Sequence, residues 1–287
     1  MIDLVPWGAD RVDDIVDLML RVAANEDLTP DELLTACHER SGIVMATEDG
    51  ESVIAVGIDR DLNGQLVASI RLIAVGPKVQ RSGRGGLLLQ HAEQWAAERG
   101  AQELLVGGEV PFSLWPGAPV ESPIAALCAT RGFETHESWQ SYLVPTTYRA
   151  DVPDGITIRR AIHDDDVTRV LLAATSGWPR SADEISRALE HGTCHVALRG
   201  ESDPVVVGIG CHSITRAGWT GPLVVDESYR RRGIGNALLG QICRDLMIAE
   251  FDSVVAAEIP DDGARLFIES VGAVPSTRYQ RMSKRLS

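Results

Sequence analysis

Basic residues, long apolar runs and paired cysteines are all scarce in this sequence. Lysine and arginine number 27 against 41 aspartate and glutamate, which gives a formal net charge of −14. Binding to nucleic acid or to an anionic membrane requires a surplus of cations, so neither partner is expected. The longest apolar runs, such as Val205–Ile209, are too short to span a bilayer. Residues 1–4 lack the basic and apolar regions of a signal peptide, and we therefore expect a cytoplasmic protein.

The five cysteines show no framework spacing. None lies in a Cys-x-x-Cys motif, and an odd number is typical of proteins in a reducing compartment. Histidine directly follows cysteine at three places, 37–38, 194–195 and 211–212. Adjacent residues on a strand point to opposite faces, so the last two pairs cannot chelate one ion as neighbours. No metal ion is expected.

A Gly-rich segment occurs twice in the chain. QRSGRG at 80–85 matches RRRGIG at 230–235, and in both places an apolar run precedes the segment and a helical pattern follows it. Further matches join 105–111 to 254–260 and 132–140 to 272–280. A chain of 287 residues is long enough for two domains of ordinary size. We therefore predict two domains, 1–148 and 149–287.

Each copy has the pattern of a mixed α/β domain. In the second copy the periodicity predicts strands at 156–160, 194–198, 205–213, 222–225, 253–259 and 278–286, and helices at 164–174, 182–190, 235–249 and 263–271. Ser181, with Glu184 three residues later, is predicted to cap the second of these helices. The first copy repeats this order, with helices at 10–23, 30–39 and 85–98 and strands at 43–47, 52–58 and 65–75.

The repeated segment has the chemistry of an anion-binding turn. Its glycines permit positive φ angles and let a ligand approach the backbone closely. The first amides of the following helix have no intrahelical partner, and the helix dipole adds partial positive charge there. Such a turn can bind a pyrophosphate. The alternative is a tight turn in which glycine serves packing alone, and the presence of two copies disfavours it.

The two copies resemble GCN5-related N-acetyltransferase (GNAT) domains, whose coenzyme motif is Q/R-x-x-G-x-G/A at a helix start. The resemblance extends to Val75-Gly76-Pro77, to Gly132-Phe133 and to the closing segment 279–284. It implies a tandem two-domain protein of the α/β class, in which each domain has a mixed, mostly antiparallel sheet flanked by helices. It also implies acetyl-CoA as coenzyme, bound by residues of both loops and of the strand ends before them: Val75, Gln80, Arg81, Ser82, Gly83, Arg84, Gly85, Gly86, Val225, Arg230, Arg231, Arg232, Gly233, Ile234, Gly235 and Asn236.

The resemblance also suggests catalytic groups. In the family a carboxylate or a water chain removes a proton from the attacking amine, and a tyrosine protonates the leaving thiolate. Glu109 and Glu258 hold matched positions at the end of the fifth strand and are candidate general bases, although a solvated strand-end carboxylate is the alternative. Cys128 and Ile268 replace the tyrosine. Cys128 is a candidate acid, whereas Ile268 cannot donate a proton.

Three residues of the first copy are candidates for acceptor binding. Glu26 and Asp27 lie in an acidic region that borders the acceptor site in the family, which favours a cationic acceptor such as a polyamine or an amino sugar. Acidic residues at a helix start are also common for local reasons. The first copy has about nine residues, Phe112–Val120, that the second copy lacks. Trp115 in this insertion is expected beside the acyl end of the coenzyme, where the loop would shape the acceptor pocket or block it; a packing loop is the alternative.

These features predict an N-acetyltransferase that moves an acetyl group from acetyl-CoA to a primary amine of a small molecule. The alternative is a non-catalytic module that binds or senses acyl-CoA, and the missing tyrosine favours it. The first copy is preferred for the chemistry because it has the more acidic acceptor region and Cys128. A small-molecule amine is the expected partner. The chain is expected to be a monomer or a homodimer, since two fused copies can form internally the pair that single-copy members make.

Overall fold

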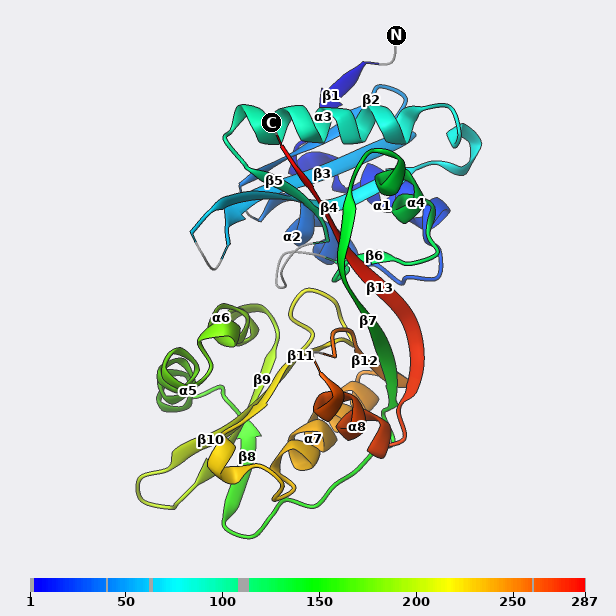
Figure 1. The fold of residues 1–287 in the computed structure, drawn as a ribbon. Coiled ribbons are helices and arrows are strands. Elements are labelled where there is room, and N and C mark those ends of the chain that lie inside the picture. The colour runs from blue at the N-terminus through cyan, green and yellow to red at the C-terminus, as the bar shows by residue number, and fades with distance from the viewer. Residues whose placement is uncertain (1–2, 40, 62–63, 108–113, 260, 287) are drawn as a thin grey trace. The chain divides into compact units, whose positions relative to one another are not determined.

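The computed structural model describes residues 3–39, 41–61, 64–107, 114–259 and 261–286, and the chain forms two compact units (Figure 1). The N-terminal unit comprises Met1–Ser138 with Arg278–Ser287, and the C-terminal unit comprises Trp139–Thr277. The predicted domains, 1–148 and 149–287, follow chain order. The compact units do not: the end of the second copy, Arg278–Ser287, belongs to the N-terminal unit, and the end of the first copy, from Trp139 on, belongs to the C-terminal unit.

The sheet of the N-terminal unit has five strands in sequence order plus an added strand from the end of the chain. They are β1 (Leu4–Pro6), β2 (Gly42–Thr47), β3 (Ser52–Arg60), β4 (Leu66–Val75) and β5 (Glu103–Val106). The pairs from β1 to β4 are antiparallel, and β5 runs parallel to β4. The final part of β13 (Val274–Arg285) pairs antiparallel with β5, with Met282 opposite Val106. It also pairs with the short β6 (Ala118–Pro119) and so covers an edge that would otherwise expose unpaired backbone groups.

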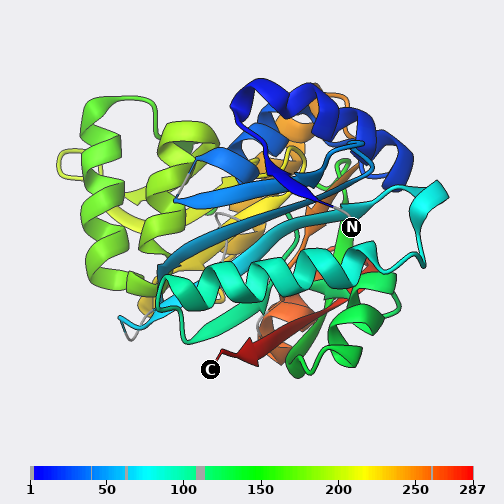
Figure 2. The ribbon, with the colours of Figure 1, turned by 90° about the horizontal axis from the view of Figure 1, so that it is seen from above.

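Helices cover both faces of this sheet (Figure 2). On one face, α1 (Val12–Val22) and α2 (Pro30–His38) bury Ile15, Leu18 and Leu33. On the other, α3 (Arg84–Glu98) and α4 (Pro123–Thr130) bury Leu88, Leu89 and Cys128. Two 3₁₀ turns, η1 (Ala9–Arg11) and η2 (Pro77–Val79), lead into α1 and toward α3. The Thr29 hydroxyl and the Glu32 carboxylate form a capping box at the start of α2, which fixes where that helix begins.

The C-terminal unit has an antiparallel sheet in the order β11-β10-β9-β8. Its strands are β8 (Ile156–Arg160), β9 (Thr193–Arg199), β10 (Val205–His212) and β11 (Thr220–Val225). A further strand, β12 (Ser253–Ala256), pairs antiparallel with the second half of β7 (Glu134–Pro145). A single bridge between Trp219 and Val255 joins β12 to the start of β11.

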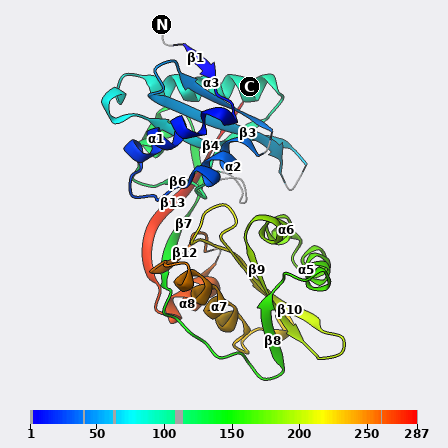
Figure 3. The same cartoon turned by 180° about the vertical axis from the view of Figure 1, so that it is seen from behind.

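The helices of the C-terminal unit repeat the arrangement of the first (Figure 3). α5 (Asp164–Gly177) and α6 (Ala182–His191) pack on one side of the sheet, and α7 (Ile234–Ile248) and α8 (Asp262–Ser270) contribute to the core on the other. Two 3₁₀ turns, η3 (Pro179–Ser181) and η4 (Glu227–Tyr229), precede α6 and α7. The prediction that the Ser181 side chain caps α6 was wrong. The turn η3 leads directly into the helix and gives Ser181 a ψ of 1°, whereas a capping residue has an extended ψ.

The α/β class and the repeated, helix-flanked sheets predicted from the sequence are confirmed. The predicted helices and strands are present with ends shifted by at most four residues, and the strand predicted to reach residue 259 ends at Ala256. The strand predicted at 278–286 begins at Val274, and its final part belongs to the N-terminal unit. Within the described ranges, no helix has the length and apolar character needed to cross a membrane.

Candidate functional site

The two Gly-rich loops have the same backbone conformation. Arg81 has a φ of 59° and Gly83 a φ of 87°, and the matched Arg231 and Gly233 have φ values of 59° and 82°. A positive φ is unfavourable for a residue other than glycine, so its recurrence at both arginines marks a specific loop geometry. In each unit the loop joins the end of a strand to the first turn of a long helix, α3 or α7.

This geometry leaves amides available to a ligand. Gly83 and Gly233 are the N-caps of α3 and α7, and neither helix has a side-chain cap. The first-turn amides of residues 84–86 and 234–236 therefore have no partner within their helices, and they stand at the positive end of the dipole. A Cβ at Gly83 would meet nothing within 4 Å, and one at Gly233 would meet only Pro153 at 3.5 Å. The residues present fit a pyrophosphate, because both turns combine free amides with open space.

The first residue of each motif binds back to the strand. Gln80 Nε2 donates to the Val75 carbonyl oxygen at 3.2 Å, and Arg230 Nε donates to the Val225 carbonyl oxygen at the same distance. Ser82 Oγ likewise donates to the carbonyl oxygen of Val79 at 2.6 Å. In this structure these three side chains hold the loops in shape. Their predicted contact with the coenzyme would therefore come from the backbone.

Arginines surround the two loops differently. Arg84 donates to Asp49 at 2.8 Å, and hydrogen bonds from Thr47 and Arg84 hold the pKa of Asp49 at about 2. Its guanidinium group is therefore committed to the β2–β3 turn, and only its amide faces the loop. In the C-terminal unit, Arg231 and Arg232 are exposed, and the Arg232 guanidinium lies 5.3 Å from the centre of the Tyr229 ring. Exposed arginines at this loop can bind phosphate oxygens.

Among the residues that the structure describes, the central strand next to each loop has an edge without a partner strand. In the N-terminal unit, β4 pairs with β5 only as far as Ile70, which lies opposite Val106. The neighbouring residues Val56 and Ala55 of β3 lie opposite Ile70 and Leu72. Arg71, between these two, therefore has no residue opposite it on β3 and forms a bulge. In the C-terminal unit the register of β11 shifts between Thr220 and Leu223, so the bulge includes Gly221. Gly221 comes 150 residues after Arg71, the same spacing that separates the two loops.

The strand edge beyond each bulge suits an extended ligand. Within the described residues, the ladder between β4 and β5 ends before the bulge, and β11 meets β12 only at the bridge from Trp219. From the bulge to Val75 or Val225 the edge is about 16 Å long at roughly 3.3 Å per residue. Its backbone amides and carbonyls can bind the amide groups of an arm such as pantetheine, as an added strand would. Val75 and Val225 therefore lie between the loop and the bulge, at the strand ends where the sequence analysis predicted contacts with the coenzyme.

The candidate acid does not lie at this edge. Cys128 is fully buried in the core beneath α3 and α4. Burial, with the nearby Glu93 carboxylate, raises the pKa of its thiol to about 12. Ile268, at the matched position of the second copy, is also buried. These positions contribute to packing in this structure.

Of the two candidate bases, the structure describes only Glu258. Glu109 lies outside the described residues. Glu258 is exposed and follows β12. Burial, together with the Glu258 carboxylate, raises the pKa of Glu184 on α6 to about 8. The sequence analysis singled out Glu184 only as a partner of a helix cap, because no local signal shows that it lies near a residue 74 positions away.

Two of the three acceptor candidates contact each other. The Trp115 indole Nε1 donates to Glu26 at 3.1 Å, which ties the insertion to the segment between α1 and α2. Leu114, the residue before Trp115, is fully buried in the core of α1 and α2. Asp27 is exposed and has a φ of 43°. Leu114 and Trp115 of the insertion therefore pack against the core of the N-terminal unit.

A polar cluster lies under α7. His195 Nε2 lies 2.8 Å and His212 Nε2 3.5 Å from the same Asp245 oxygen, since neighbouring strands place both rings on one face. These three groups have a spacing that could hold a metal ion. However, Arg160 Nε donates to that oxygen at 3.0 Å and already balances the carboxylate charge. Although burial opposes it, hydrogen bonds from the two histidines and Arg160 hold the pKa of Asp245 well below its usual range.

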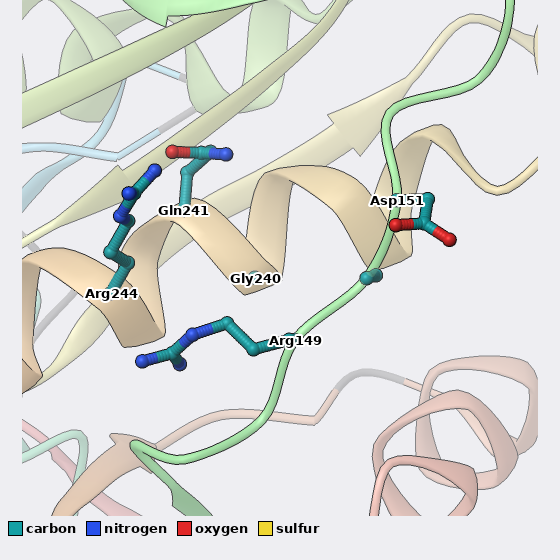
Figure 4. A pocket seen from close by; sticks show the side chains of 6 residues that line it. Arg149, Asp151, Gly240, Gln241 and Arg244 are labelled. Carbon is teal, nitrogen blue, oxygen red and sulfur yellow. The ribbon is translucent and has the colours of Figure 1, made fainter.

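Among the hollows that the described residues form, two lie in the C-terminal unit. One, of about 370 Å³, lies between α7 and the segment after β7, where Figure 4 shows Arg149, Asp151 and Arg244 around it. Arg149 donates to the Thr146 carbonyl oxygen at 2.7 Å and so contributes to the structure of this segment. The other, of about 550 Å³, extends from α5 to Arg230 at the entrance of the Gly-rich loop. Only the second hollow adjoins the candidate coenzyme site.

A strand whose ladder with its neighbour ends early among the described residues, a glycine turn with free amides and a helix occur together twice, which defines a duplicated α/β domain with a turn suited to an anion. The model of the Acetyltransferase (GNAT) family matches residues 11–111 and 162–273. The chain belongs to this family, as a tandem member with two GNAT domains. This membership confirms the family resemblance seen in the sequence, and it supports acetyl transfer as the general activity.

Solved structures share the fold at low sequence identity. A GCN5-related glucosamine N-acetyltransferase region of a fungal multi-domain GH3 β-N-acetylglucosaminidase has a TM-score of 0.78 at 16% identity, over 99% of this chain and 38% of that one. This chain thus spans well under half the length of that protein. A tandem GNAT protein from the clavulanic acid biosynthesis pathway has a TM-score of 0.75 at 15% identity, over 100% and 99% of the two chains.

A GCN5-related N-acetyltransferase from Sphaerobacter thermophilus has a TM-score of 0.65 at 18% identity, over 99% of this chain and 96% of that one. At these identities the likeness shows the fold alone. Among curated proteins, no sequence matches this chain.

Proposed function

We propose that this protein is an N-acetyltransferase that transfers the acetyl group of acetyl-CoA to a primary amine of a small molecule. The observation that carries this proposal is the pair of loops with the same conformation, each with left-handed backbone at its second and fourth positions and each beside a strand edge that no described residue pairs. Diphosphate binding needs the loop, and an extended arm needs the edge. A simple packing turn explains neither the repeated arginine strain nor the adjacent bulge.

The chain's own groups divide the work of binding. Amides of 81–86 and 231–236 would hold the pyrophosphate, and the edges ending at Val75 and Val225 would bind the arm. When bound, acetyl-CoA supplies an acetyl group already activated as a thioester. Thiolate is a tolerable leaving group, so transfer is compatible with the absence of an exposed acid at Cys128 or Ile268.

Charge favours an amine acceptor. Glu184 and Glu258 place two carboxyl groups near each other in the C-terminal unit, and the whole chain carries a net charge of −14. Such a field attracts ammonium groups and repels anionic acceptors. Glucosamine, which the name of one similar structure mentions, is a primary amine of this kind. At 16% identity it serves only as one member of a test panel.

A thiol-release assay with acetyl-CoA tests the proposal. The panel contains polyamines, amino sugars and short peptides, with matching alcohols as controls. Release that depends on a primary amine, with the acetylated product seen by mass spectrometry, is the expected result. Tight CoA binding without turnover on any amine would support the non-catalytic acyl-CoA module instead.

A further inference from the structure

We propose that the two copies of the repeat are obligate partners, because the end of the last strand of each copy completes the sheet of the other. Residues 282–285 pair with β5 of the first copy, and residues 142–145 pair with β12 of the second. These two segments are called the docking strands below. A chain that is cut between the copies should therefore stay together as a heterodimer of its two fragments. This inference goes beyond the proposed function and does not depend on the reaction.

The two docking strands lie in the same register. Met282 lies opposite Val106 of β5, and Tyr142 lies opposite Ala256 of β12. Met282 comes 140 residues after Tyr142, the spacing that relates 132–140 to 272–280, and Ala256 comes 150 residues after Val106, the spacing that relates the two Gly-rich loops. Both pairings are antiparallel. The exchange is therefore symmetric, as in a dimer whose subunits exchange an identical element.

Each docking strand adds buried side chains to the core of the other copy. Met282 is 2% exposed and belongs to one cluster with Leu104 of β5. In the C-terminal unit, Tyr142 and Val144 are buried in one cluster with Val254 of β12. Without these strands, β5 and β12 would expose apolar side chains together with a row of backbone amides and carbonyls. A copy on its own therefore lacks part of its core.

Polar contacts make β5 specific for the strand of the second copy. Lys284 Nζ donates to Glu93 Oε2 at 2.8 Å, and the Ser283 hydroxyl donates to the Glu103 carboxylate of β5. The Glu93 side chain is only 17% exposed, so water screens its charge weakly. At the position that matches Lys284, the strand of the first copy has Val144. A second fragment of the first copy would thus leave Glu93 without this cation.

The edge of β12 is specific in the opposite sense. Val144 is fully buried there in an apolar cluster, and the Tyr142 hydroxyl donates to Glu269 at 3.1 Å. A strand from a second fragment of the second copy would place Lys284 where Val144 is buried. Burial of an ammonium group costs stability unless a carboxylate pairs with it. The partner that each copy fits is therefore the other copy, in preference to a second copy of itself.

The docking strands adjoin the strands that flank the candidate coenzyme edges. Val106 of β5 lies opposite Ile70 of β4 on one side and opposite Met282 on the other. In the C-terminal unit, β12 likewise has the bridge to Trp219 on one side and the docking strand of the first copy on the other. The strand beside each candidate coenzyme edge is thus held by residues of both copies.

A cleavable form of the full chain tests the exchange. A recognition sequence for a site-specific protease is inserted between Asp151 and Val152, two exposed residues of the segment that joins β7 to β8. The uncut protein is the reference. After complete cutting, native mass spectrometry should show a single species that contains one fragment of each copy, with no pair of identical fragments.

Exchange of fragments between the cut protein and an isotope-labelled cut copy measures how firmly the strands hold. Met282→Ala removes a buried side chain and should speed dissociation about 30-fold or more. Lys284→Glu should speed it about 10-fold, since an attraction becomes a repulsion, and Glu93→Lys in the same chain should restore part of the loss. Lys78→Glu, the same substitution at an exposed lysine outside the docking strands, is the matched control and should exchange at the wild-type rate.

The two measurements can each overturn the proposal. Fragments that separate or precipitate once the chain is cut would contradict it, and so would pairs of identical fragments. Exchange that is as slow in Met282→Ala and Lys284→Glu as in the Lys78→Glu control would show that the docking strands do not hold the copies together.

Discussion

Arg71 and Gly221 occupy the same point of the two units, at the bulge of the strand that leads to the Gly-rich loop. One position holds a buried cation and the other holds no side chain at all. The duplicated loops have nearly the same backbone conformation, so this pair is a clear difference between the two units close to the loops. The same chain thus contains two similar coenzyme cradles with different surroundings.

Substitution of the loop glycines should remove CoA binding one site at a time. Gly83→Glu and Gly233→Glu each place a side chain at a positive φ and a negative charge opposite the pyrophosphate. Calorimetry should show loss of one site in each single variant and of both in the double variant. Gly100→Glu is the matched control for backbone strain, because Gly100 has a φ of 79° and lies at the far end of α3. Unchanged CoA affinity in all three loop variants would refute the binding assignment.

Leu114→Ala should destabilise the protein by about 2–5 kcal/mol, the usual cost of truncating a buried leucine. Leu114 is fully buried, so its removal leaves a cavity beside Leu72. Urea unfolding of the variant and the wild type measures the difference. Leu20→Ala, at an exposed leucine of α1, should change stability by less than about 0.5 kcal/mol. Equal effects of the two substitutions would show that the insertion does not pack as described.

The Asp49–Arg84 ion pair should contribute to stability only above acidic pH. The pKa of Asp49 in the folded protein, about 2, lies below the usual value of an aspartate. The contribution of the pair to stability is therefore present above about pH 4 and is lost as the pH falls through 2. Asp49 is partly exposed, and Asp49→Asn should therefore cost about 0.5–1 kcal/mol at pH 7. Urea unfolding at pH 7 and at pH 2 compares the two proteins. A difference that persists unchanged at pH 2 would contradict this account.

Asp245→Asn should destabilise the C-terminal unit by about 3 kcal/mol, because it removes the negative charge that Arg160 and two buried histidines face. Thermal unfolding measures this loss. Added zinc should not raise the melting temperature of the wild type, since Arg160 already neutralises the carboxylate. A zinc-dependent rise that disappears in His195→Ala would instead identify a metal site.

Glu184→Gln should change how stability depends on pH. A folded pKa raised to about 8 means that the native state keeps a proton that the unfolded chain loses near pH 4.5. The wild type should therefore lose stability relative to the variant as the pH rises from about 4.5 to 8. Melting temperatures measured across this range, with Glu190→Gln as the control, provide the test. Parallel curves for wild type and Glu184→Gln would show that Glu184 is not desolvated.

Much of the fold could be predicted from the sequence because its signals are local or repeated. Apolar periodicity located the helices and strands, and the QRSGRG and RRRGIG segments located both helix starts. The predicted side-chain cap of α6 was wrong because a 3₁₀ turn precedes the helix and sets the backbone conformation of Ser181. The sequence did not predict that the end of β13 pairs with β5 and that the second half of β7 pairs with β12. Chain order does not indicate which edge of a sheet a strand will cover.

The candidate site was predictable in its coenzyme half and less so in its acceptor half. Loop conformation depends on neighbouring residues, so glycine spacing indicates it. Glu184 and Glu258, or His195, His212 and Asp245, are brought together from different elements, and no spacing in the sequence marks them. The burial of Cys128 is likewise a property of the packed helix pair and of no local motif.

By itself the sequence determined that this protein has two α/β domains, each with a glycine turn at a helix start, because backbone freedom and apolar periodicity are written into neighbouring residues. Only the tertiary structure decided that Leu114 and Arg71 are buried in the N-terminal unit, and that the Ile214 side chain lies against Gly221 in the C-terminal unit. It also decided which carboxyl group is held at a raised pKa, because burial and charge depend on residues that meet only after the chain has folded.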